Sequence, residues 1–372
     1  MLNSNEVLIT TTSLSMPSIP QSEFLSTRNL SQIFNNTTAT YKFYWFMSIL
    51  QMFNNERKER MSAKDIAIRM IANAWYPIHY FRLSFGVGDS LNEIVNSMEW
   101  LADLKMDSTS QEIISRLTSM SNHPEIRTAL NKLTTYVPYR FLMPWIHTAN
   151  DKEMMERSHT LENHCLYSIH KESNELYIVI NPVWYNYLVD YYGILTDFIN
   201  WNLTLFLQAR NPNVPNIPNK LARPAERISL ARQHRFWNDV IKIGANVHCI
   251  YSGREIHIDN YVIDHFLPWN FVAHNQLWNL IPADQSINSS KGDKLPQIEK
   301  YLPKLAEEHR NAIRTYLSAG RETTAIDDFT ALGYTPRELL SLNRERFLAA
   351  YQQTFTPLFQ IARNTGFEVW NN

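Results

Sequence analysis

Apolar residues recur every three or four positions through most of the chain, which is the spacing of an amphipathic helix. The pattern predicts helices at 38–53, 63–80, 90–104, 111–120, 123–136 and 183–209, and again at 227–242, 297–317 and 335–364. Two short apolar runs, 166–169 and 176–180, predict a β-hairpin across the polar turn 171–174. We therefore predict an α+β protein that is mostly α-helical.

The composition agrees with this fold class. The chain of 372 residues has only 9 glycines but 10 Trp, 18 Tyr and 18 Phe, which favours helices with aromatic packing over a turn-rich β protein. The aromatic run 41–46 has two interpretations: it stacks on bases, or it is part of a buried helix, and the helix is favoured.

A different pattern begins after residue 260. The run 261–266 is rich in β-formers and predicts a strand, and 277–282 predicts a second strand that is stopped by a proline. A polar loop separates the two runs. A helix follows near Ile287, with Asp284 or Ser286 as its cap. The local pattern is therefore strand, loop, strand, helix.

Polar residues with hydrolytic chemistry fall within this pattern. Asp264 and His265 are neighbours on the first strand, so both side chains reach one cleft only if the backbone bends there. A neutral imidazole accepts a proton from water near pH 7. The carboxylate of Asp264 and the amide oxygen of Asn288 are hard ligands that suit Mg²⁺ or Mn²⁺. Lys291 lies one helical turn after Asn288, where an ammonium group can meet a phosphate. The set predicts phosphodiester hydrolysis.

The segment from about residue 245 to 296 resembles the HNH (ββα-metal) nuclease motif. The resemblance rests on His265, Asn279 and Asn288, which are 14 and 9 residues apart, with Asp264 before the histidine and Lys291 after the last asparagine. This is similar to the His-Asn-Asn form in the HNH domain of RNA-guided CRISPR effector nucleases. It implies a small HNH nuclease module within the helical protein.

The resemblance also implies a role for each residue. Asp264 and Asn288 are expected to bind the Mg²⁺ or Mn²⁺ ion, and His265 is expected to be the general base. Asn279 is expected to brace the loop and orient the histidine. Lys291 is expected to contact a phosphate or the leaving group.

Many HNH proteins hold a structural zinc with two Cys-x-x-Cys pairs, and this chain departs from them. Its only cysteines are Cys165 and Cys249, and Ser252 stands where the partner of Cys249 is expected. We therefore predict no structural zinc and a module held by packing against flanking helices. The other His/Cys cluster contains His159, His164, Cys165 and His170, and its spacing matches no standard zinc motif.

Charge limits how the chain holds nucleic acid. Its net charge is −1, and residues 223–310 contain 11 Lys/Arg and 10 Asp/Glu. Because the chain has no excess of positive charge to attract phosphates, a metal, a local groove or a partner protein must supply the affinity for nucleic acid. The candidate nucleic-acid contacts are Lys291, Lys294 and Arg254.

The chain is expected to have three parts. The proline-rich stretch 211–218 is the best candidate for a linker. It separates a helical recognition or assembly region, 1–215, from the nuclease module, 216–296, and a helical C-terminal region, 297–372, is expected to pack on that module. Residues 1–24 are expected to form an extended arm.

The start of the chain lacks the layout of a signal peptide, no apolar run is long enough for a membrane span, and few cysteines favour the cytoplasm.

The resemblance implies a DNA endonuclease of bacterial restriction or phage defence. Its expected partners are DNA and either a sensor or ATPase protein or further copies of the chain. One alternative is an RNA-cleaving HNH nuclease. Another is a nucleic-acid-binding or assembly subunit in which the HNH fold is silent.

Overall fold

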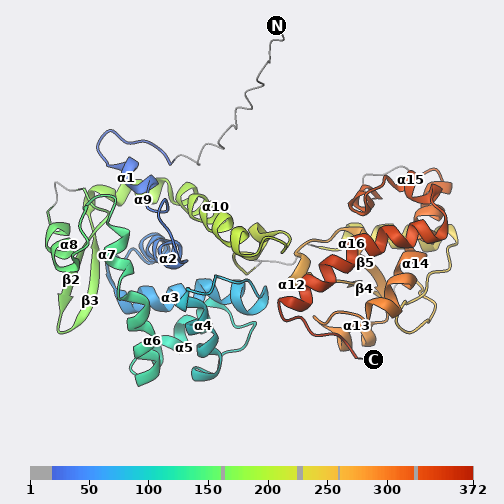
Figure 1. The fold of residues 1–372 in the computed structure, drawn as a ribbon, viewed down its shortest axis with the longest axis horizontal. Helices are drawn as coiled ribbons and strands as arrows, with labels where there is room; N and C mark the ends of the chain where they lie inside the picture. Colours follow the sequence, from blue (N-terminus) through green and yellow to red (C-terminus); the bar gives the residue numbers. More distant parts are fainter. Residues whose placement is uncertain (1–18, 161–163, 224–228, 259, 322–325, 372) are drawn as a thin grey trace, which may run out of the picture. The chain divides into compact units, whose positions relative to one another are not determined.

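The computed structural model describes residues 19–160, 164–223, 229–258, 260–321 and 326–371. Figure 1 shows that helices make up most of this part, with two small antiparallel sheets. The predicted class, a mostly helical α+β protein, is confirmed. Most of the predicted arm 1–24 lies outside the described residues.

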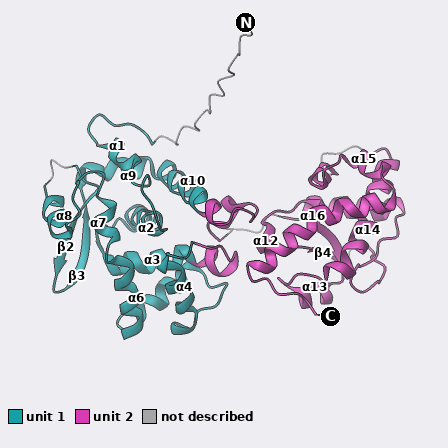
Figure 2. Cartoon of the chain, in the orientation of Figure 1, with its two compact units in different colours: residues 1–74, 86–206 teal, residues 75–85, 207–372 magenta. Residues whose placement is uncertain are grey.

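The chain divides into two compact units, drawn in two colours in Figure 2. Unit 1 consists of Met1–Ala74 and Gly86–Phe206, and unit 2 consists of Trp75–Phe85 and Leu207–Asn372. Our predicted boundaries after 215 and 296 do not coincide with this division. The proline-rich stretch 211–218 lies within unit 2, where its residues Val214 and Ile217 are buried.

Unit 1 is built mainly from helices with an aromatic core. They are α1 Thr27–Ser31, α2 Tyr41–Glu56, α3 Ala63–Trp75, α4 Ser90–Leu101, α5 Ser110–Ser119, α6 Pro124–Thr134, α7 Val137–Phe141, α8 Asp151–Ser158, α9 Tyr185–Asp190 and α10 Tyr192–Arg210. The last of these continues into unit 2. Within α2 the side chains of Tyr44, Trp45 and Phe46 are fully buried, so residues 43–46 of the aromatic run pack in the core, whereas Tyr41 and Lys42 are half-buried.

The sheet of unit 1 contains the predicted hairpin. Strands β2 Tyr167–Glu172 and β3 Glu175–Ile180 pair antiparallel across Ser173 and Asn174, which both adopt positive φ, as a tight hairpin turn requires. A third strand, β1 Arg60–Ser62, pairs with β3 and gives the order β1-β3-β2. The sequence pattern missed β1 because three residues are too few for an alternation to show.

Unit 2 surrounds a two-stranded sheet with helices. Its α-helices and strands after α10 are α11 Ala231–Ile243, β4 Val262–His265, α12 Trp269–Val272, β5 Leu280–Ala283, α13 Gln285–Lys291, α14 Ile298–Ser318, α15 Pro336–Ser341 and α16 Arg344–Asn364. One continuous hydrophobic cluster joins the sheet to α11, α14 and α16. The predicted helix 335–364 is interrupted between α15 and α16, where Asn343 caps the second helix.

A buried histidine connects the sheet to two helices of unit 2. His309 on α14 lies 2.8 Å from the hydroxyl of Tyr351 on α16 and 3.0 Å from the carbonyl oxygen of Leu280 on β5. Burial lowers the pKa of His309 to about 4, so the ring is neutral at pH 7. A neutral ring accepts from one partner and donates to the other, which satisfies both nitrogens.

The segment Trp75–Phe85 contributes to unit 2 although it precedes the rest of that unit by more than a hundred residues. The Asn211 side chain accepts from the amide of Ser84 at 2.9 Å and donates to its carbonyl oxygen at 2.8 Å. The rings of Phe81 and Trp269 lie 5.9 Å apart, and Arg82 donates to the carbonyl oxygen of Gly366. These contacts join the segment to three separate parts of unit 2.

Candidate functional site

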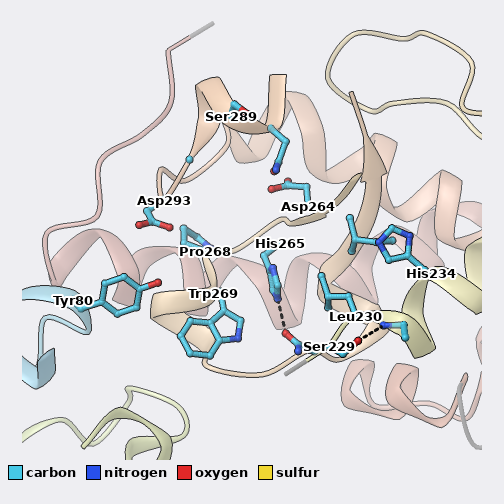
Figure 3. Close-up of a pocket in the computed structure, with 15 residues that line it drawn as sticks. Tyr80, Ser229, Leu230, His234, Asp264, His265, Pro268, Trp269, Ser289 and Asp293 are labelled. Carbon is cyan, nitrogen blue, oxygen red and sulfur yellow. Dashed lines mark hydrogen bonds between the residues drawn. The ribbon is translucent and has the colours of Figure 1, made fainter. Parts of the chain in front are cut away.

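The site is assembled on the β4–β5 hairpin and the helix that follows it. The strands pair antiparallel, with His265 opposite Leu280 and Asp264 opposite Ile281, and α13 begins directly after β5. Asp264, His265 and Asn288 line one cavity of about 760 Å³ within unit 2. Figure 3 shows Asp264 and His265 near its centre, with Tyr80 and Asp293 at one side and His234 at the other.

Two buried side chains hold the Asp264 carboxylate. The hydroxyl of Tyr251 donates to Oδ2 at 2.5 Å, and Nζ of Lys291 donates to Oδ1 at 2.9 Å. An ionised carboxylate has about four acceptor positions, so Asp264 keeps acceptor capacity beyond these two bonds. The pKa of the Tyr251 hydroxyl is raised well above its usual range by burial and then by the Asp264 charge, so the tyrosine remains the donor.

The position of Lys291 differs from our expectation of a phosphate contact. Its side chain is 1% exposed and forms an ion pair with Asp264, and Nζ also donates to the carbonyl oxygen of His265 at 2.7 Å. Lys291 is not among the described residues that line the cavity. The three-residue spacing predicted that Lys291 lies on the same helix face as Asn288. It could not predict that the lysine side chain turns inward and neutralises the buried carboxylate of Asp264.

His265 is held by Asn275, a residue of the loop between β4 and β5 that our sequence analysis did not single out. Its Nε2 lies 2.9 Å from Oδ1 of Asn275, and Figure 3 marks this bond. Burial lowers the pKa of His265, an effect opposed by the Asn275 bond and the Asp264 charge and increased by Lys291. The ring is therefore neutral at pH 7. When Nε2–H donates to the amide oxygen, the lone pair remains on Nδ1.

Asn279 lies fully buried immediately before β5 and binds the loop that follows β4. Its Oδ1 accepts from the amide of Leu267 and its Nδ2 donates to the carbonyl oxygen of the same residue, both at 2.9 Å. Asn279 therefore fixes the backbone two residues after His265. Among the hydrogen bonds of the described residues, it is Asn275, not Asn279, that bonds to the imidazole.

The oxygen donors of the cavity suit a hard divalent cation. Asn288, on α13, is half-buried and lines the cavity, and its side chain forms no hydrogen bond with the described residues. Asp293 adds a second carboxylate to the lining that our sequence analysis did not single out. Asp264 and Asn288 offer one carboxylate and one amide oxygen, which fit Mg²⁺ or Mn²⁺.

The two other predicted nucleic-acid contacts lie in different surroundings. Arg254 is exposed and lines a neighbouring cavity of about 580 Å³ that shares Ser289 with the first, and its guanidinium has no partner among the described residues. Lys294 is half-exposed and lies 3.8 Å from the Glu368 carboxylate.

The cysteines and the His159–His170 cluster do not line this cavity. Cys165 and Cys249 are both buried and unpaired. His159 and His170 stack at 4.3 Å, and His159 Nε2 lies 2.7 Å from the carbonyl oxygen of Ile169. In the part of the chain that the structure describes, no three His, Cys, Asp or Glu side chains form a group that could hold a metal ion.

Comparison with known protein families agrees with the geometry. Residues 249–297, which include β4, β5 and α13, match the family described as HNH endonuclease. No curated protein and no solved structure matches the chain. None of the described helices is long and apolar enough to cross a membrane. Residues 249–297, which lie within unit 2, are thus similar to the HNH endonuclease family, and this segment is called the HNH domain below.

Proposed function

We propose that this chain is a metal-dependent HNH endonuclease that hydrolyses phosphodiester bonds of DNA. The observation that carries the proposal is the meeting of Asp264, His265 and Asn288 in one cavity. A base, a carboxylate and an amide at one surface are the groups that a cation-assisted attack by water requires.

The charge of the cavity supports dependence on a metal. The described residues that line it include the carboxylates of Asp264 and Asp293 but no lysine or arginine. Lys291 does not line it because its side chain is buried against Asp264. A phosphodiester that entered would meet like charge at close range, which is unfavourable. Asp264 and Asn288 would hold Mg²⁺ or Mn²⁺. A bound cation supplies the charge that stabilises the phosphate and the departing oxygen.

The protein groups then have separate tasks. His265 takes a proton from the attacking water at Nδ1, since Nε2–H is directed to Asn275. Lys291 and Tyr251 keep the Asp264 carboxylate in one orientation. Asn279 fixes the loop after the histidine. Arg254, which is exposed, would contact a neighbouring phosphate.

The biological setting follows from the motif and the charge. The similarity to the HNH domain of RNA-guided effector nucleases favours DNA as substrate and a role in phage defence or restriction. A net charge of −1 favours help from a sensor or ATPase partner, or from further copies of the chain. The two unpaired cysteines favour the cytoplasm.

The test is cleavage by the purified full chain. Plasmid DNA and RNA of the same sequence are incubated side by side with Mg²⁺, Mn²⁺ or a chelator. We expect DNA cleavage with either metal and none with the chelator. Loss of a general base costs about 10²–10⁴-fold in rate, and His265→Ala should show this loss.

The matched control is His257→Ala, since His257 is an exposed histidine of the same domain that does not line the cavity. It should cleave at the rate of the unchanged protein. Equal rates for the two variants would show that His265 is not the base, and cleavage in chelator would refute the metal dependence.

A further inference from the structure

Unit 1 contains a cavity of its own, separate from the HNH domain. It has a volume of about 470 Å³ and lies among the loop before α2, the start of α4, the end of α6, and α7. Sites for small molecules typically range over about 300–1,000 Å³, so this cavity is of suitable size for a ligand.

The lining of this cavity carries positive charge. Lys42, Lys132 and Arg140 line it, and its described lining contains no aspartate or glutamate. The guanidinium of Arg140 has no hydrogen-bond or ion-pair partner among the described residues. Lys132 lies 3.7 Å from Glu93, and both side chains are more than half exposed, so water weakens this pair.

The third cation is partly withdrawn from water. Nζ of Lys42 donates to the carbonyl oxygens of Ile33 at 3.0 Å and Asn36 at 3.4 Å, and neither partner neutralises its charge. Burial lowers the pKa of Lys42. A bound anion would offset this loss of hydration. The buried Asp89 carboxylate, next to Ser90 in the chain, accepts from the amide and the hydroxyl of Thr40.

An aromatic ring stands beside these cations. Tyr136, between α6 and α7, lines the cavity although its side chain is 62% exposed. The hydroxyl-bearing residues Thr37 and Ser90 also line it. An exposed ring near several cations is the combination by which proteins bind a nucleotide, since the ring stacks on the base and the cations bind the phosphate.

We propose that the cavity between α2, α4, α6 and α7 binds a phosphate-bearing nucleotide unit, with Arg140, Lys132 and Lys42 on the phosphate and Tyr136 against the base. The nucleotide is either free or part of a single strand of nucleic acid, because both present the same groups. The site is separate from the HNH domain, so the proposal does not depend on cleavage activity.

The test is calorimetric titration of the full chain in chelator, where no metal-dependent cleavage occurs. The probes are adenosine 5′-monophosphate, a 5′-phosphorylated oligothymidylate and inorganic phosphate. A charge-assisted bond to phosphate contributes about 1.5–3 kcal/mol, so Arg140→Gln should weaken nucleotide binding about tenfold or more. Tyr136→Ala should weaken it by a similar factor through lost stacking, but should leave binding of inorganic phosphate unchanged.

The matched control is Arg127→Gln, an exposed arginine on α6 outside the cavity, which should change affinity less than about twofold. Tighter binding of the mononucleotide identifies a free nucleotide as the ligand, and tighter binding of the oligonucleotide identifies a strand. Equal affinities for Arg140→Gln and Arg127→Gln, or no saturable binding of either nucleotide probe, would overturn the proposal. An unchanged affinity for nucleotide in Tyr136→Ala would overturn the assignment of a base.

Discussion

Replacing Lys291 with methionine tests the ion pair beneath the cavity. Lys291→Met keeps most of the length of the side chain and removes the charge that neutralises Asp264. The two side chains are 1% and 4% exposed, so the carboxylate would remain away from water without its counter-ion. Breaking a buried pair costs about 3–5 kcal/mol. Because Tyr251 still donates to the carboxylate, we expect the lower end, about 3 kcal/mol.

The measurement is hydrogen exchange of the β4 and β5 amides, which reports the opening free energy of unit 2 without requiring both units to unfold together. Lys294→Met is the matched control, because Lys294 is half-exposed and its pair with Glu368 contributes at most about 1 kcal/mol. The double variant Asp264→Asn, Lys291→Met should recover much of the loss, since no charge remains unpaired. If Lys291→Met and Lys294→Met were equally stable, Asp264 would not depend on Lys291 for its charge balance.

Three further predictions concern the rest of unit 2. Asn288→Ala should lose cleavage because it weakens metal binding, whereas Asn288→Asp and Asn288→His should keep part of the cleavage activity with a changed preference between Mg²⁺ and Mn²⁺. The cleavage rates of the three variants are measured as a function of metal concentration. Near-normal rates in all three would exclude Asn288 as a metal ligand. Asn279→Ala leaves two backbone groups of Leu267 unpaired at about 1–3 kcal/mol each, and should lower both the opening free energy of the loop amides and the cleavage rate. The pKa of His309 is about 4 when folded, below its unfolded value, so its contribution to stability is complete above pH 6.5 and is lost as the pH falls towards 4. His309 should therefore contribute about 3 kcal/mol to the loss that hydrogen exchange of unit 2 shows over this range, beside a contribution from His274, whose pKa is also lowered to about 4. The loss should be smaller in His309→Gln, and an equal loss in the variant would assign the pH dependence to other groups.

The local layout of the HNH domain was predictable because each of its elements has a short-range signal. Enrichment in β-forming residues predicted strand 261–266, and β4 spans Val262–His265. The run 277–282 was predicted as a strand throughout, but its first three residues, Leu277–Asn279, form a 3-10 turn and β5 starts at Leu280. Pro282 did not stop that strand, because a two-stranded sheet leaves an edge on which proline is tolerated.

Partners across long separations were not predictable in the same way. The bond from Tyr251 to Asp264 spans 13 residues, and the one from Lys291 to Asp264 spans 27. Both depend on side chains turning inward, which neither periodicity nor composition reports. Asn275 and Asn279 are both plausible partners for His265 from spacing alone, and only the path of the loop selects Asn275.

The segment Trp75–Phe85 has a consequence for inheritance. Genes recombine as continuous stretches, but unit 2 is encoded by two stretches with most of unit 1 between them. A transfer of residues 207–372 alone would carry His265 to a new protein without Tyr80 of its cavity wall, and without the Ser84 backbone that Asn211 binds. We therefore expect the two units to have descended together.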